Sequence, residues 1–160
     1  MQTAQKGATL INQTIAKHVN RSAEDTFNVI GTGIYEYHPK GEKEVVEIRP
    51  ITDGPVGVGS RAIMVRREFM RTTESEYVIT EFEQDRRIAA HHPDPSMDFR
   101  IRFEITPIDS GSCTVQTDVQ AQPKGWMRIL EPVVRLVFRK QGERLANSMV
   151  EVVESATVRT

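Results

Sequence analysis

The 160-residue sequence predicts an α+β domain in which a curved antiparallel sheet of about seven strands wraps around one long C-terminal helix. Two observations carry this prediction. Apolar residues recur at helical spacing between Trp126 and Val153, and the chain before them reads mostly as strands joined by short polar links. At ~1.5 Å per residue, roughly 28 residues would form a helix about 42 Å long, which suits a sheet better than another small helix.

The C-terminal stripe is the strongest helical signal in the chain. Most of its steps are three or four residues, so its members share one face of a helix. They are Trp126, Leu130, Val133, Val134, Val137, Phe138, Leu145, Met149 and Val152. We expect the half from Leu145 onward to pack tightly, and the half before it, interrupted by Pro132, to leave room for a cavity.

The first third of the chain predicts one strand followed by two short helices. Thr9–Val19 carries β-branched residues in loose alternation, which favours a strand. Ser22 is a candidate N-cap, with Asp25 three residues later, and Gly31 ends the helix that follows. The inward-facing residues of that helix are expected to be Phe27, Val29 and Ile30. Ile34–Pro39 is short and aromatic, so it is either a second short helix or a bent connector.

The middle of the chain predicts six further strands in a meander. Their links are short enough for antiparallel hairpins, and three glycines with a proline in Asp53–Gly59 indicate a turn. The expected strands are Glu44–Ile51, Ser60–Phe69, Thr72–Glu83, Arg87–His92, Met97–Pro107 and Ser112–Ala121. The alternation is clearest after Met97, where every second residue to Ile105 is apolar and is expected to face the core.

The bulk composition favours one cytoplasmic domain spanning residues 1–160, with residues 1–7 expected to be a flexible N-terminus. The formal charge of -1 gives no general attraction to nucleic acid or to an anionic membrane, although local patches remain possible. Cys113 has no second cysteine to pair with and is expected to be a small buried hydrophobe. No apolar run of ~18 residues is present, so we expect no stable membrane insertion.

Several stretches carry a family resemblance that covers roughly Ala8–Glu154. The junction Val19–Phe27, the glycine-rich loop Asp53–Ser60, and Ile79–Glu83 followed by Arg86–Ala89 resemble polyketide cyclase/dehydrase-like proteins. These belong to the SRPBCC, or START-like, superfamily, which also holds the pollen-allergen fold. The resemblance implies a helix-grip fold, in which the sheet grips the long C-terminal helix.

The resemblance further implies a small hydrophobic ligand in a cavity between the sheet and the C-terminal helix, such as a lipid, an isoprenoid or quinone, a sterol-like compound or a polyketide. The alternative is a polyketide cyclase or dehydratase acting without metal, and a non-enzymatic role is favoured over it. A second alternative is a protein-interaction module with a collapsed cavity. We expect no cofactor, metal or nucleic acid, and a homodimer stays open.

The expected ligand-binding residues come from the aromatic stretch after the first helix, the inner face of the sheet and the start of the long helix. Phenol and imidazole groups among them could hydrogen-bond a carbonyl or hydroxyl on an otherwise apolar ligand. They are Tyr35, Tyr37, His38, Met64, His92, Phe99, Ile101, Trp126, Met127, Leu130 and Val134. No titratable pair has a spacing that identifies a catalytic residue.

Other chemical motifs are weak in this sequence. His91 and His92 are adjacent on a strand and therefore point to opposite faces, so they cannot readily share one metal ion. The serines do not stand in a nucleophile elbow, and the glycines of Asp53–Gly59 do not form a phosphate-binding loop. Either Arg66 or Arg67 could point inward, where it would need a carboxylate such as Glu81 or one on a ligand.

Overall fold

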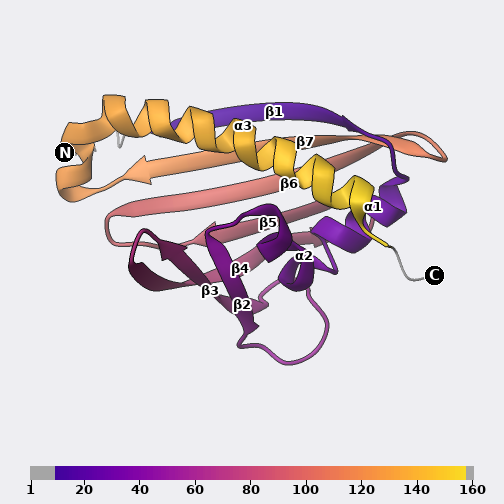
Figure 1. The fold of residues 1–160 in the computed structure, drawn as a ribbon, viewed down its shortest axis with the longest axis horizontal. Coiled ribbons are helices and arrows are strands. Elements are labelled where there is room, and N and C mark those ends of the chain that lie inside the picture. Colours follow the sequence, from indigo (N-terminus) through magenta and orange to yellow (C-terminus); the bar gives the residue numbers. More distant parts are fainter. Residues whose placement is uncertain (1–9, 158–160) are drawn as a thin grey trace, which may run out of the picture.

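The computed structural model describes residues 10–157 and contains a seven-stranded sheet, three α-helices and one 3-10 helix, η1 (Figure 1). The elements are β1 (Ile11–Val19), α1 (Ala23–Ile30), α2 (Ile34–Gly41), β2 (Val45–Pro50), β3 (Arg61–Glu68), β4 (Arg71–Glu83), β5 (Arg87–His92), β6 (Met97–Asp109), β7 (Ser112–Pro123), η1 (Gly125–Leu130) and α3 (Glu131–Ser155). The predicted strands and their order are confirmed. Residues 1–7, expected to be a flexible N-terminus, lie outside the described residues.

The sheet is antiparallel throughout, with strand order β1-β7-β6-β5-β4-β3-β2. Strands β2 to β7 form the predicted meander, and β1 joins it at the edge beside β7. The register pairs Ile101 with Ala90 on one side and with Val119 on the other, so the apolar faces of β5, β6 and β7 coincide. This shared face is the inner face of the sheet, and α3 lies across it (Figure 1).

The two short helices form as local sequence signals predict. The Ser22 side chain accepts a hydrogen bond from the backbone N–H of Asp25 at 3.0 Å, which caps α1, and Gly31 ends it. Phe27, Val29 and Ile30 of α1 are buried as expected. The segment left open between helix and connector is helical, and Pro39 lies inside α2.

The C-terminal helix begins later than predicted. The prediction of one helix from Trp126 onward was wrong, because Gly125–Leu130 forms the 3-10 helix η1 and α3 starts at Glu131. Pro132 lies in the first turn of α3, where its missing N–H costs no intrahelical bond. Pro132 therefore marks the start of a regular helix.

The buried face of α3 also differs from the predicted stripe. Its buried residues are Phe138, Gly142, Ala146, Met149 and Val153, whereas Val133 and Val137 are 59% and 46% exposed. The small residues Gly142 and Ala146 explain why this side of α3 is the buried one. A Cβ at Gly142 would collide with the side chain of Gln13 on β1, so the helix sits close to the sheet at this point. No helix in the described part of the chain is long and apolar enough to cross a bilayer.

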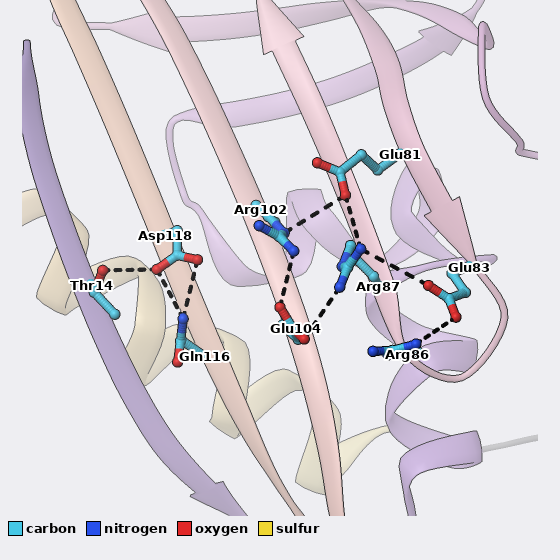
Figure 2. Close-up of polar contacts among 9 residues, drawn as sticks. All are labelled: Thr14, Glu81, Glu83, Arg86, Arg87, Arg102, Glu104, Gln116 and Asp118. Carbon is cyan, nitrogen blue, oxygen red and sulfur yellow. Dashed lines mark hydrogen bonds and ion pairs between the residues drawn. The ribbon is translucent and has the colours of Figure 1, made fainter.

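The outer face of the sheet carries a balanced network of charges (Figure 2). Arg102 lies 3.1 Å from Glu104 and 3.7 Å from Glu81, and Arg87 lies 3.3 Å from Glu104. Exposed ion pairs of this kind contribute only about 0–1 kcal/mol each. We therefore infer that this network of charges helps to align neighbouring strands on the solvent-exposed face of the sheet.

Candidate functional site

The inner face of the sheet is filled more completely at one end than at the other. A large core cluster lies under α1 and the second half of α3, and a smaller cluster lies under the first half of α3. Ile101 packs against both clusters. In the zone between them His92, Phe99 and Ile101 are only partly buried, although they point inward. Solvent therefore reaches the inner face in this zone.

Five rings form a continuous row across this zone, from α2 over the sheet to α3. The centroid distances between neighbours are 6.4 Å for Tyr35 and Tyr77, 4.8 Å for Tyr77 and His92, 5.5 Å for His92 and Phe99, and 6.0 Å for Phe99 and Phe138. Tyr77 and His92 are stacked, and the other pairs meet edge to face. We call these five residues the aromatic row.

Two hydroxyl groups of the aromatic row are buried without a hydrogen-bond partner among the described residues. They are the Oη atoms of Tyr35 and Tyr77. Burial raises the pKa of both tyrosines. The neighbouring Ser60 side chain partly offsets the rise at Tyr35, and the proximity of Tyr35 raises the pKa of Tyr77 further. Both phenols are therefore neutral near pH 7 and can donate a hydrogen bond. Because buried polar groups are nearly always paired in folded proteins, these two hydroxyls are donors with capacity left for a further acceptor.

A charged group borders the aromatic row at the end of α2. Glu42 Oε2 lies 3.5 Å from His38 Nε2 and 3.2 Å from Arg66 Nη1. Burial alone would raise the pKa of Glu42, but His38 and Arg66 outweigh it, and the pKa is lowered. Glu42 is therefore an ionised carboxylate beside the His38 ring. The sequence left the direction of Arg66 open, and its partners prove to be Glu42 and Glu68.

His92 occupies the centre of the aromatic row as a neutral imidazole. Burial, followed by the neighbouring His38, lowers the pKa of His92 to about 4. Its neighbour His91 points to the outer face, where Nε2 lies 2.7 Å from Asp98 Oδ1. The two histidines thus face opposite sides of the sheet, as their adjacency predicted, and they do not share a site.

The predicted ligand-binding residues fall into two groups, those on the sheet, α2 and α3, and those of η1. Tyr35, His92, Phe99, Ile101 and Val134 line or border the zone beneath the first half of α3, and Met64 is buried in the large cluster. His38 borders the aromatic row, while Tyr37 packs beneath Lys40, whose Nζ lies 4.5 Å from the ring centroid.

The three predicted residues of η1 lie apart from the aromatic row. Trp126 and Leu130 are 66% and 41% exposed, so the structure does not place these two on the inner face. Met127 is partly buried. These residues are exposed because they belong to η1, which ends before the long helix α3 begins to pack on the sheet. Pro132 lies at the start of α3.

Sequence reasoning missed three contributors to this region, namely Tyr77, Glu42 and Phe138. Tyr77 could have been found, since it alternates with Ile79 on β4 and both are buried. Phe138 belonged to the predicted stripe but was not singled out. Glu42 gave no signal, because its role depends on Arg66, which is distant in sequence.

Comparison with known proteins identifies the family and the fold. Residues 11–154 match the family model described as polyketide cyclase / dehydrase and lipid transport. A START superfamily protein from Mycobacterium smegmatis superposes with a TM-score of 0.70 at 18% identity, covering 92% of this chain and 99% of that one. No curated protein sequence matches the chain.

Two further solved structures share the fold. Norcoclaurine synthase from Thalictrum flavum, in complex with dopamine and hydroxybenzaldehyde, has a TM-score of 0.68 at 16% identity, covering 94% of this chain and 90% of that one. The di-domain ARO/CYC StfQ from the steffimycin biosynthetic pathway has a TM-score of 0.73 at 12% identity, covering 91% of this chain and 50% of that one. The fold is the helix-grip fold, as predicted.

Proposed function

The chain belongs to the polyketide cyclase / dehydrase and lipid transport family of the START-like superfamily, and from this premise we propose that it binds a small hydrophobic molecule between its sheet and α3. The ligand class is a mostly apolar molecule, such as a lipid, an isoprenoid or quinone, a sterol-like compound or a polyketide. It carries at least one carbonyl or hydroxyl oxygen. The binding region is the aromatic row and the adjoining inner face under the first half of α3.

The pair of unpaired tyrosine hydroxyls is the observation that carries this proposal. Tyr35 and Tyr77 present two neutral donors on a surface that is otherwise aromatic and aliphatic. An oxygen on the ligand would accept from them, while Phe99 and Ile101 contact its apolar part. Apolar burial at ~25 cal/mol per Å² would supply most of the affinity, and the hydroxyls would set the orientation.

A second candidate function is a cyclase or dehydratase reaction in the same place. The Glu42 carboxylate holds His38 close to the aromatic row, which is an arrangement that can orient an imidazole for proton transfer. Tyr35 and Tyr77 could polarise a substrate carbonyl by hydrogen bonding to its oxygen. This candidate needs a substrate that reaches both His38 and the hydroxyls, whereas the carrier function needs only the hydroxyls.

Native mass spectrometry of the freshly purified protein, with lipid extraction of the same sample, tests the binding proposal. We expect a co-purifying hydrophobic molecule that raises the melting temperature when added back. At a ligand concentration 100 times the Kd the expected stabilisation is about 2.7 kcal/mol. Absence of any co-purifying molecule, together with no thermal shift across a library of hydrophobic compounds, would contradict it.

Paired variants separate the carrier from the enzyme. We expect Tyr35→Phe and Tyr77→Phe to weaken binding of the identified molecule. His38→Gln should leave the binding of a carried ligand almost unchanged, because Gln keeps a polar side chain beside Glu42. If the molecule is instead converted on incubation with the protein, and His38→Gln stops the conversion without abolishing binding, the enzyme function replaces the carrier function.

A further inference from the structure

An apolar surface covers the exposed side of η1 and the first two turns of α3. Its residues follow one another closely in sequence, and none is less than 41% exposed. We call this set the docking face: Trp126 66%, Ile129 82%, Leu130 41%, Val133 59%, Leu136 54% and Val137 46%. It lies at one end of the long axis of the molecule, on the orange part of the ribbon (Figure 1).

The docking face points away from the core because α3 buries its opposite side. Phe138 and Gly142 lie on the buried side of the helix, whereas Val133, Leu136 and Val137 lie on the side opposite to it at 100° per residue. These three residues therefore contribute little to the core. Six apolar side chains gathered on one exposed surface are more than the scattered apolar residues of an ordinary protein surface.

Basic residues continue the same surface. Lys140 and Arg144 follow Val133 and Val137 at helical spacing, so they lie on the same side of α3. Residues 124–144 hold six basic and two acidic side chains, a local charge of +4 in a chain whose net charge is -1. Within residues 10–157, Arg128, Arg139, Lys140 and Arg144 form no ion pair. The local charge is therefore largely uncompensated.

A crevice opens beside the docking face, between α3 and the edge strand β1. It has a volume of about 380 Å³ and a mixed lining, with the apolar side chains of Ile11, Pro132, Leu136 and Phe138 beside the polar ones of Asn12, Gln13, Arg135 and Arg139. Its volume falls within the range of about 300–1,000 Å³ typical of small-molecule sites. Arg135 is paired with Glu131, so Arg139 is the cation of this crevice that has no ion pair among the described residues and is available to an anionic head group.

We propose that the docking face attaches the protein peripherally to anionic phospholipid membranes. The apolar residues enter the boundary between head groups and acyl chains, and Lys140 and Arg144 meet the lipid phosphates. A membrane fits better than a second copy of the chain. A two-fold interface places the same patch against itself, so it would bring the uncompensated positive charges of two copies together.

The single tryptophan reports this interaction directly, because Trp126 lies in the docking face. The full-length protein is titrated with vesicles of phosphatidylcholine and phosphatidylglycerol in equal amounts, and with vesicles of phosphatidylcholine alone. We expect a blue shift of Trp126 emission and quenching by brominated lipid with the anionic vesicles. High salt should weaken binding, since the basic residues supply part of the attraction.

Two double variants test the apolar and the electrostatic contributions to binding separately, with binding measured by vesicle flotation. Ile129→Ser with Leu136→Ser removes apolar contacts, and Lys140→Gln with Arg144→Gln removes two charges. We expect each pair to weaken binding to anionic vesicles about tenfold or more. Ile108→Ser is the matched control. Ile108 is 56% exposed near the β6–β7 hairpin at the other end of the molecule, so binding should be unchanged.

The outcomes separate the possible occupants. The proposal is supported if the parent protein and Ile108→Ser float with anionic vesicles and both double variants do not. Absence of flotation, or equal flotation by the Ile129→Ser/Leu136→Ser variant, overturns it. A dimer seen by light scattering that the same substitutions dissociate, without vesicle binding, also overturns it and assigns the face to a second copy. The readouts do not depend on the inner-face ligand, so they stand apart from the proposed function.

Discussion

The imidazole ring of His92 stacks on the phenol ring of Tyr77, with centroids 4.8 Å apart and planes inclined by 21°. This stack joins β5 to β4 at the centre of the aromatic row. His92 is held there in its neutral form, because burial and the neighbouring His38 lower its pKa to about 4. The protonation of one ring therefore affects both the fold and the site.

The first prediction concerns stability against pH. An unfolded histidine has a pKa of about 6.5, so between pH 6.5 and 4 the unfolded chain binds a proton that the folded chain does not. The free energy of unfolding should therefore fall as the pH drops, by about 2 kcal/mol from pH 7 to pH 5. In His92→Phe, which keeps an aromatic ring, this component of the pH dependence should vanish.

Urea denaturation at pH 7 and pH 5 checks this prediction. The exposed His18 on β1 offers the matched control, since His18→Gln should keep the pH dependence of the parent protein. An unchanged pH dependence in His92→Phe would show that His92 is not the group responsible.

The second prediction concerns the unpaired hydroxyl of Tyr77. Tyr77→Phe removes a buried polar atom that has no partner in the described structure and keeps the ring stacked on His92. The free energy of unfolding should be unchanged or rise by up to about 1 kcal/mol. Tyr77→Leu, which removes the ring of a side chain only 1% exposed, should instead cost about 2–3 kcal/mol. A loss of more than about 1 kcal/mol in Tyr77→Phe would point to an unseen partner for the hydroxyl.

Period-two alternation made most of the fold predictable. Met97 to Ile105 alternate so regularly that the inner face of β6 follows from the sequence, and the Ser22 cap fixes the start of α1 in the same local way. These features depend on neighbours within a few residues, and such neighbours can be read from a single chain.

Contacts between distant segments were harder to predict. The buried side of α3 depends on Gly142 meeting Gln13 of β1, and the position of Arg66 depends on Glu42. Apolar spacing alone placed Val133 and Val137 on the buried stripe, yet both are exposed. The sequence of α3 offers two apolar faces that could be buried. The small residues Gly142 and Ala146 determine which of them packs on the sheet.

The third prediction concerns the end of α1. A Cβ at Gly31 would lie 2.6–2.8 Å from three ring atoms of Phe27. That ring is fully buried and packs edge to face against Phe82 at 5.1 Å, so it cannot easily move away. Gly31→Ala should therefore lower the free energy of unfolding by about 1–3 kcal/mol.

Chemical denaturation of Gly31→Ala and Gly57→Ala tests the steric cause. A Cβ at Gly57 meets nothing within 4 Å, so Gly57→Ala should be neutral or slightly stabilising. Equal losses in the two variants would rule out the clash with Phe27 as the reason.

The last prediction separates two residues that the sequence treated alike. Both Leu130 and Val134 were expected to border the ligand, but Val134 packs near Phe99 and Phe138 while Leu130 is 41% exposed on η1. A larger side chain at position 134 should cover more of the inner face, because the neighbouring Phe99 and Ile101 are only partly buried. Val134→Phe should therefore reduce the amount of co-purifying hydrophobic molecule at a stability cost below about 1.5 kcal/mol. Native mass spectrometry measures the amount of bound molecule, and urea denaturation measures the stability cost.

Leu130→Phe is the matched control and should retain the molecule, since its ring can project into solvent. Retention in Val134→Phe would place the ligand elsewhere, and loss in Leu130→Phe would extend the binding region to η1.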